Sequence, residues 1–134
     1  MAQNPMLSEK GLRKLPAWVA QFPEGPLRAI ASEEIVKQWA DKSVDGAGEW
    51  LKTLPKGATR DRAIIAFMGK IAGAFPETAA NWAASMEESD ARERELKNVL
   101  ENWIGSDAEA ARQWLERSDL PNEMKRRLVP AKTD

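Results

Sequence analysis

Large apolar residues recur along the chain at a fixed interval of 32 residues. One set is made of four tryptophans: Trp18, Trp50, Trp82 and Trp114. A second set comes 11 residues before each of the last three tryptophans: Trp39, Ile71 and Trp103. A constant interval of about 20 to 50 residues is typical of repeat proteins, in which each repeat is one small unit of secondary structure.

Each interval contains two helical patterns with turn residues between them. In the first pattern, apolar positions follow spacings of three and four, which place them on one face of a helix. They form three sets: Ile35, Phe67 and Val99; Val36, Met68 and Leu100; and Ile64, Leu96 and Leu128. In the second pattern an alanine comes three residues before the tryptophan, as in Ala47, Ala79 and Ala111. Glycine, proline, serine and aspartate between the patterns favour a tight turn.

These patterns, and the proline and glycine residues that end them, predict seven to eight helices. The ranges are 12–22, 26–40, 43–54, 58–73, 76–86, 90–104, 107–118 and 121–129, of which the first contains Pro16. Asp90 with Glu93, and Ser106 with Glu109, resemble capping boxes at two of the helix starts. We expect a single repeat domain over residues 12–129, with flexible segments at 1–11 and 130–134.

Pairs of short helices cannot bury their apolar faces alone, so successive pairs must stack. The sequence therefore predicts an all-α fold, a right-handed α-solenoid of tandem 32-residue helical hairpins. Its core is expected to contain the large residues of the two sets: Trp18, Trp39, Trp50, Ile71, Trp82, Trp103 and Trp114. The alternative is a surface of tryptophans that stacks on bases or grips a peptide. The apolar neighbours favour the core.

Composition limits the chemistry that this chain can perform. Its 134 residues include no cysteine, histidine or tyrosine, which removes disulfides, the usual general base and the commonest metal ligand. We therefore expect no enzymatic activity, no metal and no cofactor. A net charge of -1 provides no overall field to attract nucleic acid or an acidic membrane. No apolar run has the length of a membrane span or a signal peptide, so a cytoplasmic location is expected.

The tandem helix pairs with their tryptophan anchors resemble the tetratricopeptide and related α-solenoid families. Ala110 and Trp114 match the A-x3-F element of the tetratricopeptide unit, whereas the interval of 32 and the lack of tyrosine depart from it. The chain is also similar to tryptophan-rich repeats of uncharacterised bacterial proteins. The shared positions are Trp39, Trp50, Leu51, Leu54, Pro55, Gly57 and Arg60. The solenoid resemblance implies a scaffold that binds other proteins through an extended helical face.

Three arginines keep the same interval near the start of the first helix of each pair: Arg28, Arg60 and Arg92. A cation at this end of a helix opposes the helix dipole, so a compensating partner is expected. One interpretation is a ladder of guanidinium groups that binds carboxylates or phosphates of a partner. The other is pairing within the chain, with acids that start the second helices: Asp45, Glu77 and Glu109.

Taken together, these features predict a non-enzymatic module that binds a protein or peptide partner on a helical face. Such a module serves as an adaptor, an assembly domain or an inhibitor. The alternative is a helical-repeat protein that binds nucleic acid, against which the near-zero net charge argues. Stacking of the exposed ends of a short solenoid would also give a dimer or filament.

Overall fold

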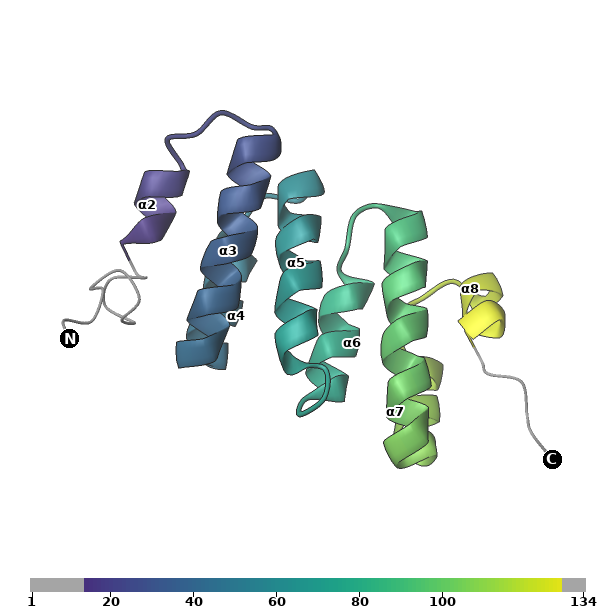
Figure 1. Ribbon diagram of the computed structural model, residues 1–134. Helices are drawn as coiled ribbons and strands as arrows, with labels where there is room; N and C mark the ends of the chain where they lie inside the picture. The colour runs from purple at the N-terminus through teal and green to yellow at the C-terminus, as the bar shows by residue number, and fades with distance from the viewer. Residues whose placement is uncertain (1–13, 129–134) are drawn as a thin grey trace. The chain divides into compact units, whose positions relative to one another are not determined.

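The computed structural model describes residues 14–128, and the ranges 1–11 and 130–134 that we predicted to be flexible lie outside them (Figure 1). The described residues form seven helices and no strands, which confirms the all-α prediction. The helices are α2 (Leu15–Val19), α3 (Pro26–Lys42), α4 (Val44–Thr53), α5 (Ala58–Ile71), α6 (Pro76–Ala84), α7 (Ser89–Arg117) and α8 (Asn122–Leu128). They belong to two compact units, Met1–Ile71 and Ala72–Asp134. A single solenoid over residues 12–129 stays a prediction.

In the first unit, α3 packs against α4 and, most extensively, against α5. Helix α3 begins with Pro26, whose fixed φ suits the first helical turn. The preceding Gly25 has a φ of 146°, and Gly57, which precedes α5, has a φ of 151°. Residues with a side chain rarely adopt this conformation. The two glycines therefore allow the sharp entry into α3 and α5.

Two tryptophans join α3 to α4. Their ring centroids are 5.9 Å apart with an interplanar angle of 22°, and Trp39 and Trp50 are 5% and 6% exposed. Between the helices, Ser43 is extended and its Oγ accepts a hydrogen bond from the Gly46 amide at 3.0 Å. This serine ends one helix and caps the next, as expected for a tight helical hairpin.

Trp18 is not part of the core, contrary to our prediction. Its side chain is 48% exposed, and its ring contacts that of Phe22 edge-on, with the ring centroids 4.8 Å apart. Helix α2 has five residues and packs against α3 through Val19, which is 2% exposed. Because one short helix can bury only one side, burial of Val19 leaves the Trp18 ring facing solvent.

In the second unit, α7 packs against both α6 and α8. Helix α6 buries Ala79 and Ala83 completely. These small side chains allow close approach of helix backbones, whereas Trp82 on the same helix is only partly buried, contrary to the prediction that it belongs to the core. The Trp114 Nε1 group donates a hydrogen bond to Asn81 Oδ1 at 2.7 Å and so joins α7 to α6.

Helix α7 consists of two arms that meet at Asp107. This residue has extended dihedral angles (φ -157°, ψ 84°) within an otherwise helical run of 29 residues. In a straight helix, 11 residues span about 16.5 Å, yet the ring centroids of Trp103 and Trp114 are 6.5 Å apart. The chain therefore folds back at Asp107, close to the boundary that we predicted between 90–104 and 107–118.

Both predicted capping boxes are wrong. At the bend, Asp107 Oδ1 accepts from the Ala110 amide at 3.1 Å, whereas Ser106 Oγ donates to the Trp103 carbonyl at 3.0 Å. At the start of α7 the capping side chain belongs to Glu88, which accepts from the Asp90 and Ala91 amides. In both places a carboxylate caps the helix, and its negative charge is favoured by the helix dipole.

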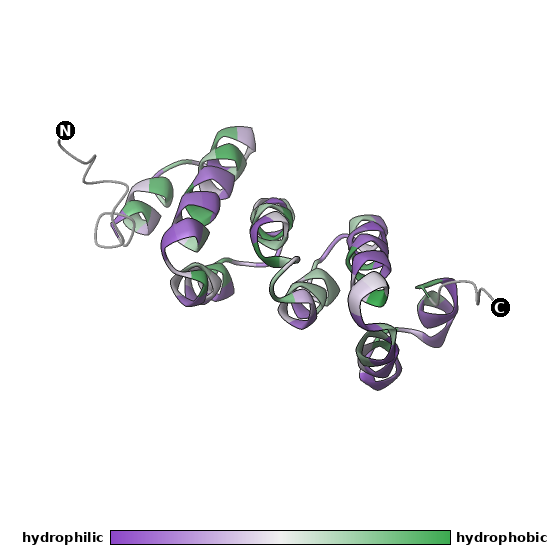
Figure 2. Ribbon diagram, turned by 60° about the horizontal axis from the view of Figure 1, so that its bottom comes forward, coloured by the Kyte–Doolittle hydropathy of each residue, from purple (hydrophilic) through white to green (hydrophobic). Residues whose placement is uncertain are grey.

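Apolar residues at the 32-residue interval are buried in both units. All members of the three first-helix sets are at most 5% exposed, and Ala47, Ala79 and Ala111 are completely buried. Five of the seven predicted core anchors are also buried: Trp39, Trp50, Ile71, Trp103 and Trp114. Figure 2 shows both apolar and polar residues along most of the helices, as expected when one face is buried and the other is solvated.

Candidate binding groove

The second unit contains an open groove of about 700 Å³. Its walls come from α6, from both arms of α7 and from residues 118–121, which connect α7 to α8. Four charged residues line it, Arg92 and Arg117 with Glu77 and Asp119, and so do Asn81 and Trp114. The groove depends on the bend at Asp107, because Arg92 lies on the first arm of α7 and Trp114 and Arg117 lie on the second.

Arg92 is the least satisfied polar group of this groove. Its Nη1 donates to the Met86 carbonyl at 3.5 Å, which is long for a hydrogen bond. Its Nε is buried and has no hydrogen-bond acceptor within residues 14–128. A guanidinium offers five N–H donors, and a buried donor without an acceptor costs about 1–3 kcal/mol. Because this Nε is closed off from solvent, a ligand that enters the groove would meet the terminal Nη groups of the guanidinium.

The other charged side chains of the groove are exposed. Arg117 Nε donates to the Gln113 carbonyl at 3.2 Å, and Glu77 and Asp119 are exposed to solvent. Among the described residues, no ion pair involves Arg92, Arg117, Glu77 or Asp119. Because exposed charges are well solvated, they gain little from pairing. The groove can therefore bind polar and charged groups, with Arg92 as the strongest attraction.

The three arginines predicted to bind a partner lie on three different helices of the two units. Arg28 lies on α3 and Arg60 on α5 in the first unit, and Arg92 lies on α7 in the second unit. Arg28 pairs with Glu24, with 3.3 Å between Nη1 and Oε1, rather than with the predicted Asp45. Arg28 is therefore paired within the chain, as one of our two interpretations expected, but its acid is Glu24.

A much smaller pocket, of about 100 Å³, surrounds the Arg28–Glu24 pair in the first unit. It is lined by the loop 54–57 and by Thr59. The Thr59 hydroxyl donates to Glu24 Oε2 at 3.4 Å, and Oε1 of the same carboxylate faces Arg28. This pocket therefore already contains a carboxylate of the chain itself, that of Glu24.

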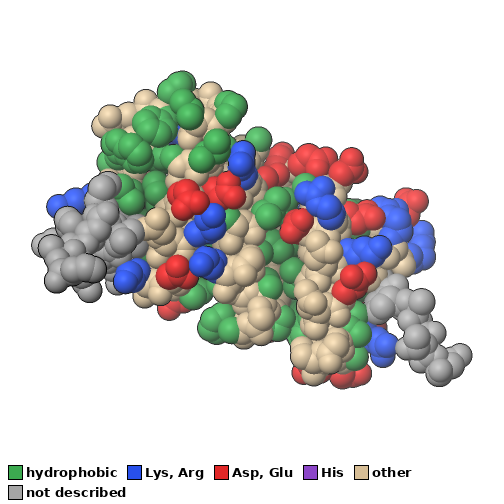
Figure 3. Space-filling model, in the orientation of Figure 1, with side chains coloured by type: hydrophobic (Ala, Val, Ile, Leu, Met, Phe, Trp, Pro, Cys, Tyr) green, Lys and Arg blue, Asp and Glu red, His purple; other side chains and the backbone are tan. Residues whose placement is uncertain are grey.

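The first unit also exposes apolar side chains near the start of α3. Trp18, Leu27 and Ile30 are 48%, 74% and 46% exposed, and apolar side chains gather over α2 and the start of α3 in Figure 3. The residues 32 and 64 positions after Ile30 are the charged Arg62 and Arg94. An apolar residue at this position is therefore particular to α3.

A metal site and a membrane span are not seen in the described part of the chain. Within residues 14–128, no three His, Cys, Asp or Glu side chains are grouped so that they could hold a metal ion. None of the helices described there has the length and apolar character needed to cross a membrane. Comparisons with protein-family models, with characterised proteins and with solved structures found no significant match to this chain.

Sequence reasoning identified Arg92 and Trp114 but not the groove that contains them. Asn81, Arg117 and Asp119 were missed because they do not stand out in the 32-residue pattern. The residues 32 positions before and after Asn81, for example, are Glu49 and Gln113. Only the fold shows that Asn81 accepts the indole N–H of Trp114.

Proposed function

We propose that this protein is a non-enzymatic, cytoplasmic interaction module, built of tandem 32-residue helical repeats, that binds a protein or peptide partner. The observation that carries the proposal is the open groove of about 700 Å³ with the unsatisfied guanidinium of Arg92 on its wall. Ligand pockets typically measure about 300–1,000 Å³. A groove of this volume accommodates several side chains of an extended segment.

The repeat character of the proposal is supported by the burial of equivalent positions. Residues 32 positions apart, such as Ala47, Ala79 and Ala111, are equally buried. The tetratricopeptide-like resemblance of the sequence agrees with this pattern. In solenoids the exposed helical faces are free to bind partners. We assign partner binding to the groove for this reason.

Charge distribution disfavours the nucleic-acid alternative. Lysine and arginine side chains are interspersed with aspartate and glutamate on the face shown in Figure 3. The net charge of the whole chain is -1. Nucleic-acid binding draws most of its affinity from clusters of positive charge that neutralise phosphates, and the mixed charges on this face do not form such a cluster.

The proposal is tested by filling the groove. Ala84 lines it at the end of α6, and Thr78 is exposed on the same helix and does not line it. Wild-type protein, Ala84→Arg and Thr78→Arg would each be used to capture partners from the native cell, with and without nuclease. We expect one protein to be retained by wild type and Thr78→Arg and lost with Ala84→Arg.

Equal capture by all three proteins would overturn the proposal, and capture that nuclease abolishes would assign the function to nucleic-acid binding. Circular dichroism melts would show whether Ala84→Arg remains folded. Ser118→Arg, in the loop that also lines the groove, provides a second way to fill it.

A further inference from the structure

We propose that the groove of the second unit binds a single carboxylate side chain in a segment of a partner protein, with the Arg92 guanidinium as its anchor. This inference rests on the proposed function, because it names the chemistry that the groove recognises. It is based on a comparison of the two arginine pockets, one of which contains a carboxylate of the chain itself.

The two pockets share an arginine and a loop at corresponding positions. Arg28 and Arg92 are 64 residues apart, which is twice the repeat interval, and so are the loops 54–57 and 118–121. Arg28 lines a pocket with the first loop, and Arg92 lines the groove with the second. In the first unit the arginine is paired with Glu24 at 3.3 Å. The first unit therefore shows how a carboxylate is held at this position.

In the second unit the corresponding acid has another role. Glu88 is 64 residues after Glu24, and its carboxylate accepts from the Ala91 amide at 2.6 Å and the Asp90 amide at 3.1 Å. It therefore serves as the N-cap of α7, and these amide hydrogen bonds, with a smaller contribution from the charges of Arg94 and Arg92, lower the pKa of its carboxyl. Within residues 14–128, the only hydrogen bond of the Arg92 side chain is the long one to the Met86 carbonyl.

The groove also has the space that the Arg28 pocket lacks. Its volume is about 700 Å³, against about 100 Å³ around Arg28. Because Arg92 Nε is closed off from solvent, an entering carboxylate meets the terminal Nη groups of the guanidinium. Hydrogen bonds between charged groups are about twice as strong as neutral ones. The incoming acid thus supplies the partner that Glu24 supplies to Arg28.

The neighbouring acids favour a carboxylate over a phosphate. Glu77 and Asp119 line the same groove, and their negative charges repel any anion that enters. A phosphate monoester carries about -1.5 to -2 charges at neutral pH, so its attraction to Arg92 and its repulsion by the two acids both increase, whereas the Glu24–Arg28 pair shows that a single carboxylate fits the equivalent arginine. The segment that binds is therefore expected to carry an isolated aspartate or glutamate rather than a phosphorylated residue.

The test selects random dodecapeptides displayed on phage against the full-length protein. Enriched peptides would be synthesised with a fluorescent label, and their Kd measured by anisotropy. We expect the peptides to share one Asp or Glu. Changing that residue to Asn or Gln, or Arg92→Gln in the protein, should each weaken binding about tenfold or more. The two changes together should cost little more than one, because they remove the same contact.

Arg94→Gln is the matched control. Arg94 lies on α7 two residues after Arg92, is exposed, pairs with Glu95 and does not line the groove. It should leave the Kd unchanged. Arg92→Lys keeps the charge but loses the planar fork, so it should give an intermediate Kd, and it serves as a second variant if Arg92→Gln fails to fold by circular dichroism.

Other outcomes separate the two proposals. Peptides that share no acid, yet lose binding to Ala84→Arg, would overturn the carboxylate anchor and leave the proposed function standing. Failure to enrich any peptide, or binding that Ala84→Arg does not affect, would count against the proposed function itself. Stronger competition by inorganic phosphate than by acetate would overturn the choice of a carboxylate. Self-association that Arg92→Gln abolishes would assign the groove to a second copy of the chain.

Discussion

At the scale of single residues, tryptophans of the same set have different surroundings and should differ in their contribution to stability. Trp50 is 6% exposed and stacks on Trp39, whereas Trp18 is 48% exposed. We expect Trp50→Ala to lower the free energy of unfolding by about 3–5 kcal/mol, because it leaves a cavity in the core. Trp18→Ala should cost less than about 1 kcal/mol. Urea unfolding followed by circular dichroism measures both, and equal losses would contradict the assignment.

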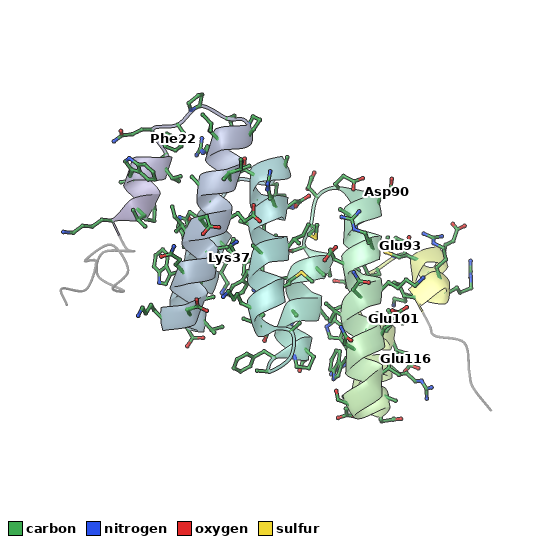
Figure 4. All side chains as sticks on the ribbon, viewed as in Figure 1. Phe22, Lys37, Asp90, Glu93, Glu101 and Glu116 are labelled. Atoms are coloured by element: carbon green, nitrogen blue, oxygen red, sulfur yellow. The ribbon has the colours of Figure 1, made fainter. Side chains whose placement is uncertain are left out.

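Glu93 should make stability depend on pH. Its carboxylate accepts from Arg127 Nη2 at 2.6 Å and from Nε at 3.0 Å, and this pairing across α7 and α8 lowers the pKa of Glu93 (Figure 4). A folded-state pKa below the unfolded value contributes stability above about pH 4.3, which is lost as the pH falls through the folded pKa. The stability difference between wild type and Glu93→Gln should therefore shrink with acidification below about pH 4.3.

The control for this experiment is Glu101→Gln, which changes an exposed acid on the same helix (Figure 4). Among the described residues, no ion pair involves Glu101. Unfolding in urea at a series of pH values would be compared for the three proteins. A difference between wild type and Glu93→Gln that stays constant from neutral to acidic pH would rule out the paired carboxylate as its cause.

The sequence predicted burial well where a residue faces the interior of its own helical pair. The apolar sets that contain Ile35, Val36 and Ile64 are all buried, because their spacing alone places them on one helix face. Trp18 occupies the same position in the interval as Trp50, yet it is exposed. The difference arises because exposure depends on which helices lie alongside, and the interval does not contain that information.

At the scale of helices, the bend in α7 depends on the cap provided by Asp107. Its carboxylate accepts from the Ala110 amide, so Asp107→Ala should destabilise the protein by about 1 kcal/mol. Ser106→Ala removes a neighbouring hydroxyl that donates to a carbonyl and caps no amide, so its effect should be smaller. Thermal unfolding of both variants distinguishes the residues, and a larger loss for Ser106→Ala would restore the capping box that we first predicted.

Gly57, which precedes α5, should be required for its backbone dihedral angles and not for lack of space around it. Gly57 has a φ of 151°, and a Cβ atom added there would meet nothing within 4 Å. Gly57→Ala should therefore cost about 1–3 kcal/mol through backbone strain. Gly69→Ala, within α5 and also without nearby atoms, should stabilise the protein by about 0.5–1 kcal/mol. Effects of the same sign in urea unfolding would contradict this explanation.

Helix ranges were predictable to within about two residues for most elements, because proline, glycine and the apolar spacing mark them independently. Caps were not predictable, because several candidate residues lie close together at each helix start. At the start of α7, Glu88 and Asp90 are both acidic, and only the backbone angles select Glu88 as the cap. The groove was not predictable, because α6, α7 and the loop 118–121 form it together.

At the scale of the whole molecule, the tandem-repeat proposal makes a prediction about length. In a solenoid each repeat contacts only its neighbours, so an added repeat should be accommodated. Insertion of a second copy of residues 58–89 directly after residue 89 should give a folded, longer protein. Its helical content per residue by circular dichroism should be unchanged. A scrambled copy of the same residues is the control, and loss of cooperative unfolding with the native copy would contradict the proposal.

The contact between Glu24 and Arg28 has a consequence for the valence of the protein, that is, for the number of sites at which it can bind a partner. A single exposed carboxylate, 67% accessible, occupies the position where the first unit would otherwise present an arginine to a partner. A glutamine at position 24 would release the Arg28 guanidinium, but the pocket around it has only about 100 Å³, so the first unit would not gain a second groove. Under our proposal the protein is therefore monovalent, with one anchored carboxylate per chain.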